Sequence, residues 1–203
     1  MLEALAGTGL AAAAGLNAYI PLLALGLLGK LTDVISLPPG WAWLENEWVL
    51  GIIGVLFLVE IVADKVPAVD HVNDILQTVV RPAAGGIVFG SGTSAQTPAI
   101  ADPGEFFTSG SWVPVAGGIV VALLVHLAKA GTRAAANAAS AGIAAPVLSV
   151  AEDVASVALV ASAILLPALV VLALAALVVG VILLVRRGRR RSLDRQARAV
   201  APV

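Results

Sequence analysis

VASVALVASAILLPALVVLALAALVVGVILLV occupies residues 154–185 and contains no charged side chain. As one continuous α-helix this stretch would be about 48 Å long, which exceeds the roughly 30 Å hydrocarbon core of a bilayer. It therefore predicts a membrane span that tilts or kinks, and Pro167 is the natural place for a kink. This segment alone assigns the chain to the helical membrane proteins.

The composition of the whole chain supports the same class. Its 203 residues are 60% hydrophobic and 12% charged, with a mean hydropathy of +1.00, whereas soluble domains carry about 25% charged residues. The length leaves room for roughly four to six spans, so residues 1–185 are expected to form one transmembrane helical domain. The absence of Cys excludes disulfides, thiolate metal sites and cysteine nucleophiles.

Six apolar segments predict an all-α transmembrane bundle. They cover residues 2–29, 48–66, 72–92, 112–130, 131–150 and 154–185. The third and the fifth are more polar than the others, so four spans plus two re-entrant helices is the alternative to six spans. The first segment lacks the basic start of a cleaved signal peptide and is expected to remain as a span. Pro21 should break it near Asn17, because a proline clashes with the carbonyl four residues before it.

The basic residues favour one orientation. Seven of the twelve Lys and Arg residues lie in the tail formed by residues 186–203. Basic flanks prefer the cytoplasm, so this tail is expected inside the cell. Lys65 and Arg81 are expected to bracket one cytoplasmic turn, and Lys129 and Arg133 another.

One acidic stretch with a histidine leads into the apolar segments. A charge at bilayer depth costs at least about 2.5–3.5 kcal/mol and needs a partner, water or a ligand. Helical spacing of three or four residues places several of these side chains on one face. Carboxylates with a histidine could relay protons or hold a hard cation, although no particular metal is indicated. The alternative is a solvated turn with snorkelling ends. The residues concerned are Glu60, Asp64, Lys65, His71, Asp74 and Arg81.

A basic stripe follows in the second half of the chain. His126, Lys129, Arg133 and Asn137 recur at three- or four-residue steps and should point to the bundle interior. Its two cations either pair with acidic residues of other segments or bind an anion such as a phosphate or carboxylate. The candidate acids are Glu60, Asp64, Asp74 and Glu152. The acids Glu152 and Asp153 are expected to cap the start of the last helix.

The predicted helix break offers a third candidate site. A freed carbonyl beside the Asn17 side chain and the Tyr19 hydroxyl could coordinate a cation or a substrate hydroxyl. Interrupted helices mark the substrate sites of many transporters. They also occur as ordinary kinks whose freed groups are satisfied by neighbouring helices.

Three blocks of the sequence resemble a bacterial polytopic membrane-protein family, domain of unknown function 4126. They are GLNAYIPLLALGLLGK at residues 15–30, EIVADKVPAVDHVNDILQTVVRP at residues 60–82 and HLAKAGTRAAAN at residues 126–137. The resemblance spans nearly the whole chain. It implies a small multi-pass protein of the inner membrane and supplies no activity, cofactor or catalytic residue.

The favoured function is that of a secondary transporter or channel for a small polar or anionic solute, which proton transfer could drive. The acids and His71 would handle protons or cations, Arg81, Lys129 and Arg133 would bind the anionic group, and Asn17 with Tyr19 would line the helix break. Partners are then the lipid bilayer and the solute, with no cofactor and no nucleic acid.

Two other classes remain open. One is a lipid-binding or lipid-processing protein that uses His126 and Asp64 as acid and base. The other is a structural subunit that packs against a second protein through the GxxxG sequence at residues 86–90. Glycine-rich faces are also compatible with a homo-oligomer. GxSxG, HExxH and P-loop patterns do not occur, so no catalytic residue is assigned and the sequence does not decide whether the chain is an enzyme.

Overall fold

The computed structural model describes residues 1–65, 67–93, 110–180, 182, 183 and 186, and for residues 67, 68, 70, 71 and 93 it describes the backbone only. Within these residues the chain is helical and forms no strand. The elements are α1 (Leu2–Leu16), α2 (Tyr19–Leu31), the 3₁₀ helix η1 (Pro39–Glu45), α3 (Glu47–Ala63), α4 (Pro67–Thr93), α6 (Trp112–Ser140), α7 (Ala145–Leu165) and a last helix, Leu169–Gly180.

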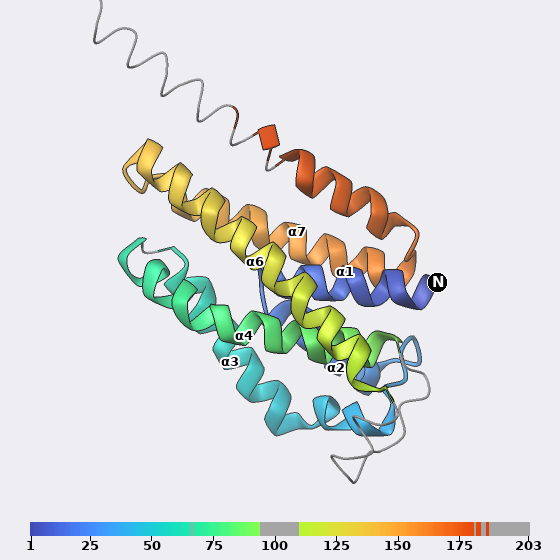
Figure 1. The fold of residues 1–203 in the computed structure, drawn as a ribbon. Coiled ribbons are helices and arrows are strands. Elements are labelled where there is room, and N and C mark those ends of the chain that lie inside the picture. Colours follow the sequence, from blue (N-terminus) through green and yellow to red (C-terminus); the bar gives the residue numbers. More distant parts are fainter. Residues whose placement is uncertain (66, 94–109, 181, 184–185, 187–203) are drawn as a thin grey trace, which may run out of the picture.

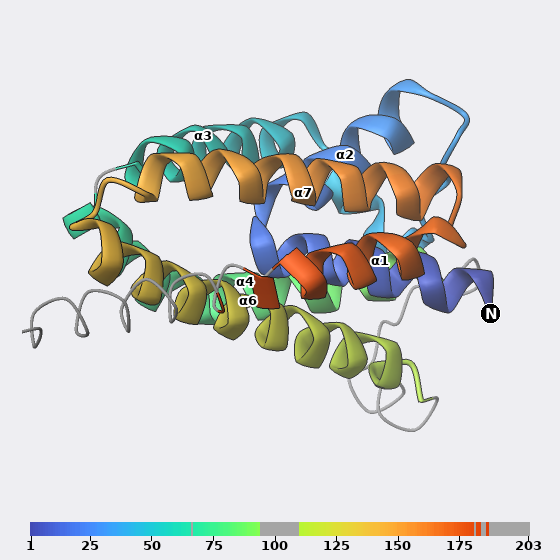
Figure 2. The ribbon, with the colours of Figure 1, turned by 90° about the horizontal axis from the view of Figure 1, so that it is seen from above.

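Four long helices, α3, α4, α6 and α7, form the frame of the bundle. They run alternately between two ends of the molecule (Figure 1). Seen from above, α3 and α7 lie on one side and α4 and α6 on the other (Figure 2). The end that holds η1 and the first residues of α3 and α6, and so all four tryptophans, is called here the tryptophan end. The opposite end, where α3 leads to α4 and α6 to α7, is called the turn end.

The first apolar segment, residues 2–29, does not form one span. It folds as two helices, and the chain turns back on itself between them at Asn17 and Ala18 (Figures 1 and 2). The start of α1 packs near Gly92 at the end of α4, while Gly26 of α2 packs against Leu44 of η1. Both open ends of the hairpin therefore lie at the tryptophan end, and its tip reaches the middle of the bundle.

The break occurs where it was predicted, but Pro21 does not interrupt a continuous helix. Pro21 is the third residue of α2, where the backbone N–H would have no intrahelical partner in any case. Helix α1 is the most enclosed element of the bundle, because Ala11, Ala12, Ala13 and Ala14 are all 0% exposed. Such a helix is apolar all round and belongs in a core.

The segments 112–130 and 131–150 are not two spans, since α6 runs without interruption from Trp112 to Ser140. It ends at Ala141 and Gly142, whose φ angles of 51° and 85° are left-handed, and this is a common way to end a helix. Lys129 and Arg133 are therefore buried side chains in the middle of α6 and do not mark a cytoplasmic turn. The small residues around them allow the helix to continue. These two residues consequently no longer indicate which side of the membrane is cytoplasmic.

Arg81 is likewise buried within α4, so only Lys65 lies at the turn end as expected. The long apolar stretch 154–185 also differs from the prediction of one tilted or kinked helix. α7 ends at Leu165, and the helix Leu169–Gly180 folds back along the bundle after Pro167 (Figure 1). A Cβ placed on Gly9 of α1 would lie 3.1 Å from Ala163 and 2.8 Å from Val170, so both arms of this second hairpin pack against α1.

Glycines bring α4 and α6 into close contact. A Cβ on Gly118 would clash with the backbone of Gly85, and one on Gly86 would lie 2.9 Å from Ile119. The other member of the GxxxG sequence, Gly90, packs against Trp41 and Val115. This sequence is therefore used for packing within the chain, which removes the feature that favoured a structural subunit.

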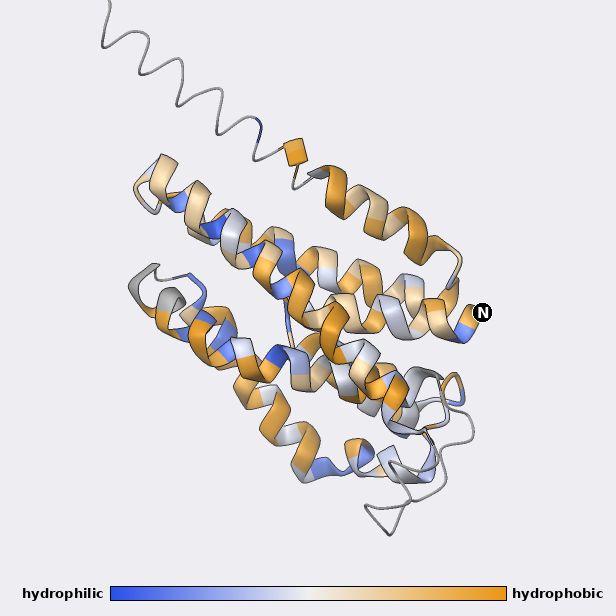
Figure 3. Ribbon diagram, viewed as in Figure 1, coloured by the Kyte–Doolittle hydropathy of each residue, from blue (hydrophilic) through white to orange (hydrophobic). Residues whose placement is uncertain are grey.

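Large apolar side chains cover the outside of the bundle. Examples are Val55, Leu58 and Val62 on α3 and Ile75 and Val79 on α4, each at least 61% exposed. Hydrophilic positions of α4, α6 and α7 gather in the half of the bundle toward the turn end (Figure 3). A surface that is apolar around a polar interior is that of a membrane-embedded protein.

Fewer helices than the six predicted are long and apolar enough to count as membrane spans. Among the described residues, α6 and α7 are long and apolar enough to cross a membrane. The pair formed by η1 and α3, which meet at 62°, is a third candidate. The helix Leu169–Gly180 is apolar but short. Six spans are not confirmed, and most of the basic tail, residues 187–203, lies outside the described residues.

Candidate functional site

The tip of the α1–α2 hairpin is held by Asn17, which is 1% exposed. Its Oδ1 accepts the backbone N–H groups of Tyr19 and Ile20 at 3.0 and 3.2 Å. This satisfies two of the N–H groups that the start of any helix leaves without an intrahelical partner. The Asn17 Nδ2 donates to Asp153 of α7 at 2.9 Å. Asn17 thus starts α2 and ties the hairpin tip to the frame.

Two backbone carbonyl groups near the end of α1 accept hydrogen bonds from side chains of two other helices. Lys129 Nζ of α6 donates to the carbonyl oxygen of Leu16 at 2.7 Å, and Ser156 Oγ of α7 donates to that of Ala13 at 3.1 Å. A cation is well placed at the negative end of the helix dipole. Lys129 therefore supplies a partner for the last carbonyl of α1 at the break.

Lys129 also belongs to a cluster of ion pairs toward the turn end. Its Nζ lies 3.1 Å from Glu152 Oε2 and 3.5 Å from Asp64 Oδ2. Arg133, one turn later on α6, donates from Nε to both oxygens of Glu152 and from Nη2 to Asp64 Oδ2 at 3.0 Å. Asn73 of α4 donates to the second oxygen of Asp64 at 3.0 Å. Two cations thus share two carboxylates.

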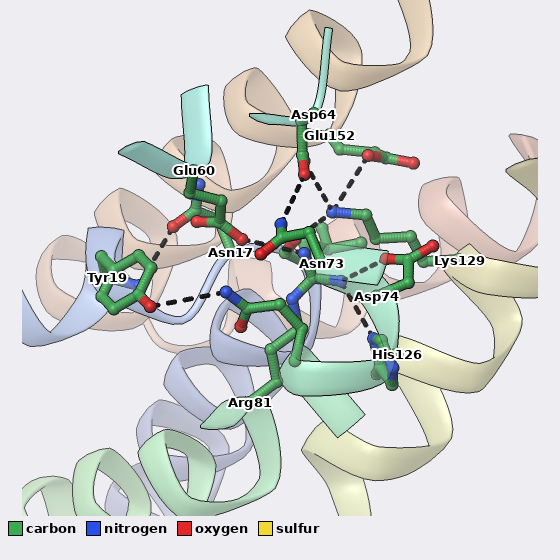
Figure 4. A network of polar contacts seen from close by, with 12 residues as sticks. Asn17, Tyr19, Glu60, Asp64, Asn73, Asp74, Arg81, His126, Lys129 and Glu152 are labelled. Carbon is green, nitrogen blue, oxygen red and sulfur yellow. Dashed lines mark hydrogen bonds and ion pairs between the residues drawn. The ribbon is translucent and has the colours of Figure 1, made fainter. Parts of the chain in front are cut away.

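A second cluster centres on Arg81 of α4, whose side chain is 0% exposed. Its Nη2 donates to Glu60 Oε1 at 2.8 Å, and its Nη1 lies 2.9 Å from His126 Nδ1 and 3.8 Å from Asp74 Oδ1. Thr78 Oγ1 lies 3.1 Å from the other ring nitrogen of His126. Figure 4 shows the two clusters side by side, close to Asn17 and Tyr19.

Several polar atoms of this second cluster have no hydrogen-bond partner among the described residues. They are Glu60 Oε2, Arg81 Nε, Asp74 Oδ1 and Gln77 Oε1. Gln77 itself is 2% exposed, and its Nε2 donates to the Tyr19 hydroxyl at 3.4 Å. Buried polar groups normally find partners, so an incompletely bonded cluster beside a helix break is a candidate binding region.

The charges are divided between the two sides of the bundle. The acids Glu60 and Asp64 come from α3 and its C-terminus, and Glu152 comes from α7. The cations Arg81, Lys129 and Arg133 come from α4 and α6. Each ion pair among these residues therefore joins the α3–α7 side to the α4–α6 side.

Most of the predicted site residues are brought together. Both stripes converge on the hairpin tip, and the members in contact are Asn17, Tyr19, Glu60, Asp64, Asp74, Arg81, His126, Lys129 and Arg133. Lys65 is exposed just after the end of α3, and its Nζ donates to the backbone carbonyl oxygen of Ile61 instead of to a site residue. Asn137 lies two turns beyond Lys129, and its Oδ1 has no hydrogen-bond partner among the described residues. The side chain of His71 lies outside the described residues.

Glu152 and Asp153 do not cap the start of a helix, although they were predicted to precede the apolar segment 154–185. α7 begins at Ala145, with Pro146 in its first turn, and so both acids lie in its interior and reach the site. Asn73 and Gln77 were missed as site residues. Their spacing from Asp74 and Arg81 on α4 could have indicated them, because a helical face repeats every three or four residues.

His126 and Asp64 serve different parts of the network. His126 contacts Arg81 and Thr78, whereas Asp64 contacts Asn73, Lys129 and Arg133. This separation gives the proposed acid and base of a lipid-processing enzyme no direct contact. Among the described residues no group of three or more His, Asp or Glu side chains is arranged to hold a metal ion.

Comparison with known proteins gives a family and no function. No curated protein and no solved structure matches the chain. The family model for a domain of unknown function, DUF4126, matches residues 4–187, which include every residue of the site. The chain therefore belongs to the DUF4126 family, whose function is unknown.

Proposed function

We propose that the protein is a secondary transporter or channel for a small polar or anionic solute, and that proton binding is coupled to solute binding. The observation that carries the proposal is the convergence of ion pairs from four helices on the tip of a helical hairpin. Non-helical backbone at membrane depth occurs where protein buries it or where it lines a solute path. Interrupted helices hold the substrate site in many secondary transporters.

Lys129 and Arg133 would bind the anionic group of the solute. In the structure both side chains form ion pairs with the carboxylates of Asp64 and Glu152. Protonation of these carboxylates would release the cations for the solute, and a bound anion would in turn favour protonation. This mutual dependence is a thermodynamic coupling of proton and solute.

The same ion pairs would control movement at the turn end. There they join the C-terminus of α3 and the interior of α7 to α6. Exchange of carboxylate for solute would therefore weaken the links between the two sides of the bundle. The Arg81–Glu60 pair nearer the hairpin tip is a further link of this kind.

The location follows from the same proposal. We place the protein in the bacterial inner membrane with the basic tail in the cytoplasm, because arginine-rich flanks of spans favour the cytoplasm. Association into a homo-oligomer stays a prediction.

Uptake into proteoliposomes tests the function. The purified protein is reconstituted with a pH-sensitive dye inside, the external medium is made more acidic, and one salt is added at a time. Phosphate, sulfate, chloride, glutamate and gluconate are the probes, because they cross bilayers slowly on their own. At least one probe is expected to accelerate acidification of the lumen.

Matched variants identify the path. Arg133→Gln and Glu60→Gln are expected to abolish the accelerated acidification. Glu47→Gln should retain it, since Glu47 is exposed and pairs with Lys30 at the tryptophan end, away from the site. Elution as a single detergent-solubilised species verifies that each variant is folded. No acceleration by any probe, or wild-type rates in both site variants, would contradict the proposal.

A further inference from the structure

His126 lies between two side chains of the neighbouring helix α4. Its Nδ1 is 2.9 Å from Arg81 Nη1, and its Nε2 is 3.1 Å from Thr78 Oγ1. The histidine is 1% exposed. Both ring nitrogens therefore have partners, and the chemistry of those partners determines where the proton sits.

Arg81 settles the state of Nδ1. A guanidinium group can only donate hydrogen bonds, so Nδ1 must accept and carries no proton. Thr78 settles the state of Nε2, because its hydroxyl already donates to the carbonyl oxygen of Asp74 at 2.9 Å. The hydroxyl oxygen is then left as an acceptor, and Nε2 must donate. His126 is neutral in this structure, with its proton on Nε2.

A second proton on His126 would have to bind at Nδ1. An N–H group would then point at the guanidinium, and the contact with Arg81 Nη1 would be lost. The charged groups around the ring are Arg81 and Asp74 of α4 and Lys129 of α6, with Glu60 of α3 bonded to Arg81. Burial of the ring and the two cations oppose the second proton, and the two carboxylates favour it.

Asp74 provides an alternative acceptor for Arg81. Its Oδ1 lies 3.8 Å from Arg81 Nη1, is buried, and has no hydrogen-bond partner among the described residues. A movement of about 1 Å would bring the two atoms to hydrogen-bond distance. The Nη2 bond to Glu60 at 2.8 Å can persist during this movement.

The geometry points to His126 as a proton-binding site that controls the partner of Arg81. With His126 neutral, Arg81 Nη1 donates to Nδ1; with His126 protonated, Arg81 Nη1 donates to Asp74. The role of this site in coupling protons to solute movement rests on the proposed function. The proton binding and the change of partner are properties of the protein without solute.

Solid-state NMR of the protein in liposomes tests this inference, with the side-chain nitrogens of histidine and arginine labelled. The chain contains two histidines, so His71→Gln leaves His126 as the sole source of the histidine signals. At pH 8 we expect one neutral form, with Nε2 protonated and Nδ1 unprotonated. On acidification both nitrogens should become protonated, and one arginine signal should shift at the same pH.

Two substitutions of aspartate sharpen the test. In Asp74→Asn a given acidic pH should protonate a smaller fraction of His126, because a carboxylate that offsets the added charge is gone. Asp33→Asn changes an exposed loop residue and should leave the titration unchanged. The inference would be overturned if the neutral form carries its proton on Nδ1 or is a mixture of the two neutral forms. It would also be overturned if no arginine signal changes when His126 is protonated.

The outcome is separable from that of the transport assay, since no solute is present in the NMR experiment. If no probe is transported but the expected spectra are observed, the proton site stands and the proposed function falls. If a probe is transported but the spectra are not those expected, the reverse holds.

Discussion

The buried ion pair between Arg81 and Glu60 either stabilises the fold or is needed for transport, and substitutions of its two residues can separate these roles. Its two side chains are 0% and 1% exposed and are joined at 2.8 Å. Removal of one partner of a buried pair costs roughly 3–5 kcal/mol, because a charge is left without compensation, whereas replacement of both by apolar residues is often nearly neutral.

We therefore expect Arg81→Met to lower the free energy of unfolding by about 3–5 kcal/mol. Glu60 Oε1 would lose its bond to Arg81, and Glu60 Oε2 has no hydrogen-bond partner among the described residues, so the Glu60 charge would be left buried. Glu60→Leu should cost less, since Arg81 keeps Asp74 and His126 within reach. The double variant Glu60→Leu/Arg81→Met should be close to the wild type in stability.

Unfolding by SDS in mixed micelles, followed by tryptophan fluorescence, measures these free energies. The exposed pair Lys30–Glu47 serves as the control cycle, and the two substitutions there should be additive. If the double variant at Arg81 and Glu60 loses as much as the two single variants together, the reasoning about the buried pair is wrong. If it regains stability but not transport, the pair is retained for function.

Three further predictions address the fold around the site. Gly118→Ala should lower the melting temperature by several degrees because its methyl group would clash with the backbone of α4, whereas Gly117→Ala meets nothing within 4 Å and should not. Asn17→Ala should cost about 0.5–2 kcal/mol through loss of the helix cap, and more if the bond to α7 adds to it; unchanged SDS unfolding would refute this role. Because the native chain has no Cys, single cysteines at Leu2 and Asp33 can be labelled with an impermeant reagent. Both should react from the same side of the membrane, and labelling from opposite sides would contradict the hairpin.

Much of the candidate site could be predicted from the sequence. Charges inside apolar segments need compensation, and their helical spacing placed Glu60 with Asp64 and Lys129 with Arg133 on common faces. The break at Asn17 was also predictable, because Asn next to a proline-containing turn of helix disfavours a continuous span. These inferences depend on residue type and local spacing, which the sequence contains in full.

The pairing of those charges could not be predicted. Asp64 was a candidate for several cations, and only the position of the C-terminus of α3 relative to α6 selected Lys129 and Arg133. The role of Glu152 depended on where α7 begins, since an acid in the first turn would have been a cap and an acid in the interior reaches the site.

The sequence by itself determined that this is a helical membrane protein with a polar interior, because hydropathy and composition state what each segment prefers to contact. Only the tertiary structure decided that residues 2–29 turn back at Asn17 and that α6 continues past Lys129 and Arg133. An apolar segment has the same hydropathy whether it crosses the membrane as one helix or folds back as a hairpin of two. The direction of the chain depends on bonds between distant residues, such as that from Asn17 to Asp153 and that from Lys129 to Leu16.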